Sequence, residues 1–359
     1  MYMSSKKLKT ALVLAAGNGT RLWPLTQNRP KPYLPLAGKP IIGRIVEGLR
    51  EAGFEDIYVV CKESEKDMLS YVESLNANPI IQKRPTGTAS AVLSAEQVID
   101  EPFLIASGDH VMDYSIYKDI VHSWDGNNMV ATKFMTDVSR FGVLSLDCGK
   151  VSKAVEKPKD VNEGFVNLGL YVVLPEVFDD LISVGVSSRG EYEFTDVLEG
   201  FSSFVTIKPW MDVAYSWQLL DAFDMLYPPD YIHIEGDAEI DKSARFEGPV
   251  YVGSNVHIGK NVVIKNSVIE ENSIIEDGTI IEDSYLMPNV RVGESSKLEM
   301  SFCGTGAIVG SNVRIEPSFV ESLNLNGKHC SVRRELGSLI AWNKKVADDT
   351  TLEGGSLIY

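Results

Sequence analysis

The spacing of apolar residues divides the chain into two regions. In the first region, short continuous apolar runs alternate with stretches whose apolar residues recur at helical spacing. The run at 11–16 is short and continuous enough to be a strand buried on both faces. Residues 41–52 have an apolar helical face and end at Gly53, a residue type that commonly closes helices. The first region is therefore expected to alternate strand and helix.

This alternation continues to residue 106. Further helices are expected at 65–75 and 90–99, and further strands at 56–60, 79–81 and 103–106. Strands that alternate with helices form a mostly parallel sheet, so we predict an α/β domain of Rossmann-like type. Ligands of such sheets bind at the carboxyl ends of the strands.

A different period begins near residue 252. An aliphatic residue leads successive units of six at Val252, Ile258 and Ile264, and the pattern continues after a slip of one residue. Short repeats of this kind build a parallel β-helix, in which each rung stacks its aliphatic residue on the next. A β-sandwich with alternating strands does not account for a sustained period of six. We therefore predict a second, β-helical domain.

The boundary between the two regions lies at Pro228 and Pro229, which stop the preceding helix. The chain has 359 residues, a length typical of about two domains. The predicted domains are a Rossmann-like α/β domain at 1–228 and a β-helix of hexapeptide repeats at 229–359.

Charge and composition exclude several partners. The formal net charge of −16 argues against nucleic acid and against an anionic membrane. Four cysteines without CxxC spacing are expected to be reduced, and a zinc site is not expected. The N-terminus has no apolar leader, and no apolar run approaches the roughly 20 residues of a membrane span. These features predict a cytoplasmic protein without membrane association.

The first predicted strand leads into a segment suited to a polyphosphate. Gly17 and Gly19 flank one residue, so the backbone can turn sharply and bring its N–H groups close to an anion. Arg21 adds a planar cation for phosphate oxygens, and Lys31 lies between two prolines that restrict its backbone. The spacing matches neither the P-loop nor the Gly-x-Gly-x-x-Gly fingerprint. Alone, the segment is also compatible with a turn carrying two solvated basic residues.

The complete string of residues 12–32 resembles the signature of the sugar-phosphate nucleotidylyltransferases, of the glucose-1-phosphate thymidylyltransferase and UDP-sugar pyrophosphorylase type. These enzymes join a sugar 1-phosphate to a nucleoside triphosphate and release pyrophosphate. The resemblance implies that Arg21, Lys31 and Asp109 act in catalysis. It implies the following nucleotide-binding residues: Ala15, Ala16, Gly17, Gly19, Thr20, Arg21, Gln82, Gly87 and Thr88.

Residues 82–89 follow a predicted strand and open a predicted helix. The amide of Gln82 can pair with a pyrimidine edge, and Gly87 lets a base lie against the backbone. Alone, the segment is an ordinary polar loop with a helix cap. It resembles the family's Gln-x-x-Pro-x-Gly-Thr-Ala base-reading segment, which implies UTP or dTTP. Both nucleotides share the edge that Gln82 contacts, so the sequence leaves the choice open.

Two carboxylates are implied as ligands of Mg²⁺. Asp109 follows the strand expected at 103–106, where a hard cation that bridges phosphates finds oxygen ligands. A single Asp there more commonly caps a turn, but its place in the family's Gly-Asp motif favours the metal. Asp212 lies in a stretch that resembles Trp-x-Asp and is implied as the second ligand, although Ala214-Tyr215 replaces the usual Gly-Thr. His110 is assigned no role.

A third group of residues is implied to bind the sugar phosphate. It comprises Gly142, Glu156, Lys157 and Asn167, each matched to a family motif. Alone, Glu156 and Lys157 are compatible with a surface charge pair. Leu168 replaces a small residue and leaves the hexose open, with glucose 1-phosphate expected first and N-acetylglucosamine 1-phosphate next.

The repeats resemble the left-handed β-helix of acyltransferases, and the whole chain resembles archaeal enzymes that join a nucleotidylyltransferase to an acetyltransferase. That acetyl transfer uses a histidine base, and Met300 stands in its place. We therefore expect the β-helix to serve stability and assembly, as a homotrimer. Two alternatives remain: a non-catalytic sugar-nucleotide-binding subunit, and a bifunctional enzyme that also acetylates an amino-sugar 1-phosphate.

Overall fold

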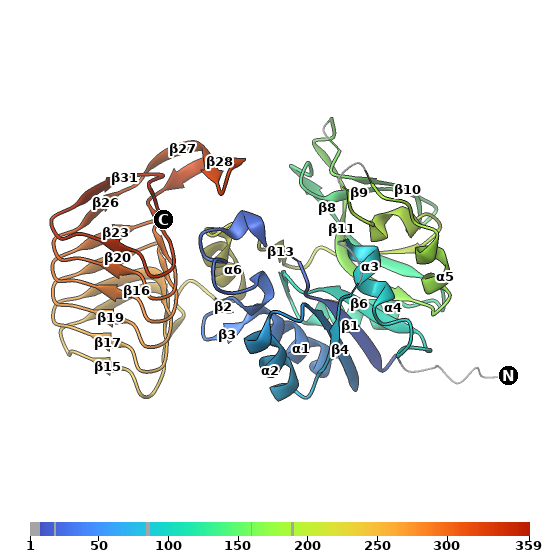
Figure 1. The fold of residues 1–359 in the computed structure, drawn as a ribbon, viewed down its shortest axis with the longest axis horizontal. Coiled ribbons are helices and arrows are strands. Elements are labelled where there is room, and N and C mark those ends of the chain that lie inside the picture. Colours follow the sequence, from blue (N-terminus) through green and yellow to red (C-terminus); the bar gives the residue numbers. More distant parts are fainter. Residues whose placement is uncertain (1–7, 18, 84–86, 159, 188–189) are drawn as a thin grey trace. The chain divides into compact units, whose positions relative to one another are not determined.

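The computed structural model describes residues 8–17, 19–83, 87–158, 160–187 and 190–359 (Figure 1). The chain forms two compact units. The first contains the residues up to Gly17 and Ile42–Met211, and the second contains Asn18–Ile41 and Asp212–Tyr359. Each unit is described by itself. Among the described residues, none of the helices has both the length and the apolar character needed to cross a bilayer.

The first unit is built on a nine-stranded sheet. Its strands are, in spatial order, β5 (Asn78–Ile81), β4 (Asp56–Cys61), β1 (Thr10–Leu14), β6 (Phe103–Ser107), β11 (Glu163–Val173), β8 (Met129–Thr136), β12 (Ser202–Val205), β10 (Lys150–Glu156) and β9 (Gly142–Asp147). The strands from β5 to β6 are parallel, whereas β11 pairs antiparallel with both β6 and β8. The α/β, Rossmann-like class is confirmed, and the antiparallel pairs extend the sheet beyond the alternating region.

The central strand has the burial that its sequence predicts. Ala11, Leu12 and Val13 of β1 have no exposed surface, and Leu12 pairs with Tyr58 on one side and Ile105 on the other. A strand hydrogen-bonded on both edges and covered on both faces must be continuously apolar, because polar side chains there would lose their water. The apolar run at 11–16 is thus explained.

The helices of this unit are α1 (Ile41–Glu51), α2 (Lys66–Ser74), α3 (Thr88–Leu93), α4 (Ser115–Ser123) and α5 (Val177–Ile182). The helix expected at 90–99 is shorter than predicted. After Leu93 the backbone bonds change to turns, with Ser94 N donating to Ala91 O and Ala95 N to Val92 O. The Ser94 hydroxyl donates to Ser90 O, a local bond of the kind that competes with helix propagation.

The second unit contains the β-helix, and residues far apart in sequence stack in register. Hydrogen bonds such as Ser284 N to Ser267 Oγ join residues 17 positions apart, which is the length of one rung. The parallel strands are β14 (Ile232–Ile234), β15 (Glu239–Ile240), β16 (Arg245–Val252), β17 (His257–Ile258), β18 (Val263–Ile269), β19 (Ile274–Ile275), β20 (Ile280–Glu282), β21 (Tyr285–Leu286), β22 (Arg291–Val292), β23 (Lys297–Glu299), β24 (Phe302–Cys303), β25 (Ile308–Val309), β26 (Arg314–Glu316), β29 (Leu339–Ile340), β30 (Lys345–Val346), β31 (Thr351–Glu353) and β32 (Leu357–Ile358).

The interior of the β-helix confirms the predicted stacking. Val252, Ile258 and Ile264 are buried in one continuous aliphatic core. The corners are tight as well. A Cβ on Gly293 would lie 2.6 Å from the backbone nitrogen of Ser311 in the next rung, so a side chain does not fit there. The hexad pattern therefore follows from two features of the β-helix: its apolar interior and the close approach of successive rungs.

One rung carries an insertion. The bond from Ser338 N to Ser301 Oγ spans 37 positions instead of 17. The extra residues form an antiparallel hairpin, β27 (Ser318–Leu325) and β28 (Lys328–Leu336), which stands out from the regular rungs in Figure 1. The second unit also contains the short strands β2 (Pro35–Leu36) and β3 (Lys39–Pro40) and helix α6 (Gln218–Leu226).

Candidate functional site

The carboxyl ends of β1 and β6 are joined closely. Gly108 N donates to Leu14 O at 2.9 Å. A Cβ on Gly108 would lie 2.7 Å from that oxygen and 3.0 Å from the Cα of Ala15, so this position accepts only glycine. The residue before Asp109 is thereby held against the start of the predicted nucleotide segment, whose Ala15 is buried and whose Gly17 is exposed. No local sequence pattern distinguishes Gly108 from other glycines.

The next part of the segment is organised around a buried lysine. Gly19 has a left-handed conformation (φ 57°), and a Cβ there would lie 2.8 Å from Lys31 Cβ. The hydroxyl of Thr26 donates to Gly19 O at 3.1 Å and closes the loop. Lys31 is 5 % exposed, and its Nζ lies 2.9 Å from Asp212 Oδ1. Because both side chains are largely removed from water, their ion pair is weakly screened and strongly directional.

Arg21 is supported by an aromatic pair. Its guanidinium carbon lies 5.8 Å from the ring centre of Tyr215, and that ring stacks on Trp217 at 4.7 Å. The side-chain oxygen of Gln218 accepts hydrogen bonds from Ala214 N and Tyr215 N. Tyr215 stands where the family motif has threonine, so this departure from the motif supplies a flat surface for the cation. No local sequence pattern predicts that Tyr215 supports Arg21.

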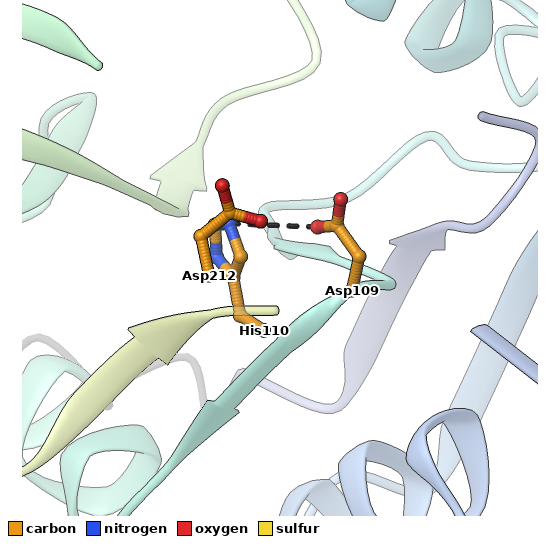
Figure 2. Close-up of side chains that lie close together, drawn as sticks. All are labelled: Asp109, His110 and Asp212. Carbon is orange, nitrogen blue, oxygen red and sulfur yellow. Dashed lines mark ion pairs between the residues drawn. The ribbon is translucent and has the colours of Figure 1, made fainter. Parts of the chain in front are cut away.

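A possible metal centre lies where two short strands pair. Asp212 ends β13 (Trp210–Asp212), which pairs with β7 (His110–Met112), and Asp109 directly precedes β7. One ligand atom from each of Asp109, His110 and Asp212 lies within 4.8 Å of the others, and Figure 2 shows the three side chains turned toward one another. The two carboxylates predicted from the sequence as metal ligands, Asp109 and Asp212, thus lie close together.

His110 has a defined neighbourhood that suits a supporting role. The Trp210 indole N–H lies 3.4 Å from His110 Nδ1, and His110 Nε2 lies 3.4 Å from Asp109 Oδ1 (dashed in Figure 2). With Nδ1 accepting from the indole, the ring proton is on Nε2 and points to Asp109. Two carboxylates suit a hard divalent cation such as Mg²⁺ better than an imidazole does.

The residues predicted to bind sugar phosphate form one group. Gly142 pairs with Glu156 in register, and a Cβ on Gly142 would lie 3.0 Å from Glu156 Oε2 and 3.6 Å from Asn167 Cβ. Glu156 accepts a bond from the Thr195 hydroxyl and forms an ion pair with Lys157 Nζ at 2.8 Å. The charge pair that the sequence allowed therefore exists, beside the other members of the group.

Asn167 is held by an irregularity in β11. The pairing of β11 with β8 shifts between Asn167 and Tyr171, and Asn167 donates to the Tyr171 hydroxyl at 2.7 Å. Its side-chain oxygen accepts from Gly169 N at 3.0 Å, while Leu168 is fully buried. Such bulges occur beside functional sites because they redirect side chains. Leu168 thus packs in the interior, and the polar side chain of Asn167 is fixed by two bonds.

The predicted base-reading segment has structural contacts of its own. Gly87 has φ 133°, and a Cβ there would lie 2.3 Å from Tyr192 O, so glycine is required by the neighbouring backbone. The hydroxyl of Thr88 accepts from Phe194 N at 2.8 Å. Gln82 continues the β4 pairing, its N donating to Cys61 O, and its side chain is half-buried. Arg84, Pro85 and Thr86 of this motif, and Asn18 of the first, lie outside the described residues.

In the β-helix, Met300 has a left-handed conformation (φ 46°) at a corner, where Gly337 N donates to its carbonyl oxygen. Its thioether cannot exchange a proton. His329, the nearest alternative base in sequence, is exposed in β28.

Comparison with known proteins identifies the family. The nucleotidyl transferase family model matches residues 10–224. The chain belongs to this family. Residues 230–326 match the model of the EIF2B subunit epsilon LbH domain, the left-handed β-helix that the repeats predict. The expected family, fold and enzyme class are therefore confirmed.

Several relatives are similar over most of their length. The chain is 34 % identical to the bifunctional protein GlmU of Methanococcus maripaludis (strain C5), covering 93 % of this chain and 88 % of the relative. It is 30 % identical to a bifunctional sugar-1-phosphate nucleotidylyltransferase/acetyltransferase of Sulfurisphaera tokodaii, with coverage of 96 % and 93 %.

Two further similarities cover a smaller share of this chain. The UTP–glucose-1-phosphate uridylyltransferase AglF of Haloferax volcanii is 32 % identical over 53 % of this chain and 82 % of its own. A crystal structure of UDP-glucose pyrophosphorylase complexed with UDP-glucose superposes with a TM-score of 0.52 and 25 % identity, covering 60 % of this chain and 97 % of that one.

Proposed function

We propose that the enzyme transfers a nucleotidyl group from UTP or dTTP to a hexose 1-phosphate, with Mg²⁺ held by Asp109 and Asp212. The observation that carries this proposal is the approach of these two carboxylates, with His110, to within 4.8 Å. One of them, Asp212, is already paired with the buried Lys31. Two oxygen ligands beside a fixed cation suit a metal-bound triphosphate.

The reaction needs little covalent chemistry from the protein. An ionised oxygen of the sugar phosphate attacks the α-phosphorus in line. The bond from that phosphorus to the bridging oxygen of the β-phosphate breaks, and pyrophosphate leaves with the electron pair. The attacking oxygen is anionic at neutral pH, so a protein base is not required. Catalysis then depends on positioning and on charge neutralisation.

The described residues divide these tasks. Lys31 and Arg21 would bind the triphosphate and stabilise the leaving pyrophosphate. Backbone groups of five further residues would surround the phosphates: Ala15, Ala16, Gly17, Gly19 and Thr20. A bound Mg²⁺ would neutralise phosphate oxygens. Gln82 would contact the pyrimidine edge, with Gly87 and Thr88 also binding the nucleotide. The sugar phosphate would lie at Gly142, Glu156, Lys157 and Asn167.

The names of two relatives specify a sugar 1-phosphate and glucose 1-phosphate, which supports a hexose 1-phosphate. Glucose 1-phosphate is our first candidate and N-acetylglucosamine 1-phosphate the next. We propose that the β-helix, from residue 229 onward, has lost acetyl transfer because Met300 replaces the base. In this proposal the β-helix acts in stability and in assembly of a homotrimer.

The test is pyrophosphate release, measured with four nucleoside triphosphates against a panel of hexose 1-phosphates, with and without Mg²⁺. Turnover with a pyrimidine nucleotide and one sugar, dependent on the metal, is expected. Thiol release from acetyl-CoA with an amino-sugar 1-phosphate is measured in parallel and is expected to be absent.

If no combination in the panel releases pyrophosphate while thermal shift still detects ligand binding, the proposal is contradicted and a sugar-nucleotide-binding subunit is favoured. Release of thiol would show that acetyl transfer persists without a histidine at position 300.

A further inference from the structure

Side chains of the β-helix contact the turn that follows the proposed phosphate-binding residues. This turn is the segment Pro35 to Gly38, which comprises β2 and the two residues that join it to β3. It belongs to the same compact unit as the β-helix. Two of the side chains that reach it, Glu270 and Tyr285, lie on neighbouring rungs and are 1 % and 0 % exposed. Both side chains carry buried polar groups, so their hydrogen-bond partners must be accounted for.

Hydrogen bonds of both side chains converge on this turn. Glu270 Oε2 accepts from Gly38 N at 3.0 Å, and Glu270 Oε1 lies 2.6 Å from the Tyr285 hydroxyl. That hydroxyl accepts from Ala37 N at 3.1 Å and lies 3.0 Å from Pro35 O. The turn therefore has two of its N–H groups and one carbonyl held by two side chains of the β-helix.

A third side chain fixes the shape of the turn. Gly38 has φ 77°, and a Cβ there would lie 2.0 Å from the Tyr251 hydroxyl. The turn thus lies directly on the β-helix surface with no room for a side chain between them. We call Tyr251, Glu270 and Tyr285 the turn clamp.

The clamp is connected to Lys31 by a short and stiff segment. Leu34 N donates to Lys31 O at 3.1 Å, and Ile41 N donates to Leu34 O at 3.1 Å. Pro32 and Pro35 restrict the backbone between Lys31 and the turn. Lys31 in turn packs against Gly19. A displacement of the turn would therefore move the lysine and the loop that it supports.

The β-helix also contacts the loop at a second place. Lys328, at the start of β28, donates to the Thr20 hydroxyl at 3.2 Å. Arg334 of the same strand forms hydrogen bonds with both carboxylate oxygens of Asp221 in α6. The inserted hairpin thus touches the segment that carries Arg21.

We propose that Glu270 and Tyr285 are positioning residues for nucleotidyl transfer, so that the β-helix sets the geometry of the triphosphate-binding loop in addition to its role in assembly. This inference rests on the proposed function, because it assumes that Arg21 and Lys31 bind the nucleotide. A purely structural clamp would change only stability.

The test compares Tyr285→Phe and Glu270→Gln with the wild type. Both variants keep the shape of the side chain. Tyr285→Phe removes the hydroxyl that bonds the turn, and Glu270→Gln removes the carboxylate charge that faces Gly38 N and the Tyr285 hydroxyl. Ser301→Ala is the matched control: Ser301 is buried in the β-helix, and its hydroxyl donates to Glu299 O and accepts from Ser338 N. The melting temperature is measured first, and kcat and the two KM values are then measured well below the unfolding transition.

We expect each clamp variant to raise the KM for the nucleotide about tenfold, the effect of one misplaced charged hydrogen bond. The KM for the sugar phosphate should stay within about twofold. Ser301→Ala should lower the melting temperature and leave both KM values unchanged. If the clamp variants lose stability while both KM values and kcat stay at wild-type values, the proposal is wrong.

If Glu270→Gln fails to fold, Tyr285→Phe alone tests the clamp proposal. If the wild type releases no pyrophosphate, the proposed function fails, and the clamp is then tested through the Kd for UTP and dTTP. A wild type that binds neither nucleotide overturns the clamp proposal as well.

Discussion

Two lysine–carboxylate pairs of similar length lie in the two regions that we propose to bind phosphates. In the nucleotide loop, Lys31 and Asp212 are 2.9 Å apart, with side chains 7 % and 11 % exposed. In the sugar region, Lys157 and Glu156 are 2.8 Å apart, with side chains 32 % and 24 % exposed. The distances are nearly equal, but the surroundings differ.

This difference indicates different tasks. Removing one partner of a buried pair leaves an uncompensated charge, so the buried lysine is held in one place before the substrate arrives. An accessible pair is screened by water and contributes little, so Lys157 can turn from Glu156 to an incoming phosphate with a small loss of free energy. The nucleotide loop is thus preorganised, and the sugar region is adjustable.

The largest effect is expected for Lys31→Met. This change keeps most of the volume, removes the charge and breaks the ion pair with the buried Asp212. We expect kcat/KM to fall about 1,000-fold, as for loss of a preorganised charge in other active sites, together with a lower melting temperature. Lys345→Met, at an exposed position of the β-helix, is the control. A loss of kcat/KM smaller than tenfold would contradict the proposed difference between the buried pair and the accessible pair.

A smaller and more selective effect is expected for Lys157→Met. The KM for the sugar phosphate should rise about tenfold through loss of one charged contact, with the nucleotide KM within about twofold. Because the pair is accessible, the melting temperature should change little. A destabilisation equal to that of Lys31→Met would show that exposure does not separate the two pairs.

The smallest effect concerns a carboxyl outside both regions. Partial burial, together with Asp221 and Asp283, raises the pKa of Asp224 to about 6. Because this pKa lies above the value in the unfolded chain, stability falls as pH rises from about 4 to about 6. Asp224→Asn should raise the melting temperature by about 1–2 °C at pH 8 and leave it unchanged at pH 4. The gain at pH 8 is small because Asp224 is accessible to solvent. Equal shifts at both pH values would exclude titration as the cause.

Local patterns predicted the regular parts of the molecule. The burial of β1 and the stacked aliphatic residues depend on spacing within a few residues, which the sequence displays directly. Motifs nominated Asp109, Asp212 and Lys31 because their order along the chain is specific. The structure brings the first two together and pairs the third with Asp212.

What the sequence did not predict depends on contacts between distant segments. Tyr215 beneath Arg21 and Gly108 against β1 have no local pattern. The hairpin at 318–336 was not predicted, because an insertion interrupts the period without giving its own shape. Glu270 and Tyr285 occupy ordinary positions in the repeats, and their role is visible only when the β2–β3 turn lies on them.

The central claim is metal-dependent nucleotidyl transfer at Asp109 and Asp212. It is tested most directly by measuring pyrophosphate release against Mg²⁺ concentration for the wild type, Asp109→Asn and the control Asp147→Asn, an exposed residue at the end of β9. The account predicts saturable Mg²⁺ dependence in the wild type and control, and a loss of about 1,000-fold in Asp109→Asn. Near-normal turnover of Asp109→Asn at the same Mg²⁺ concentrations would contradict it.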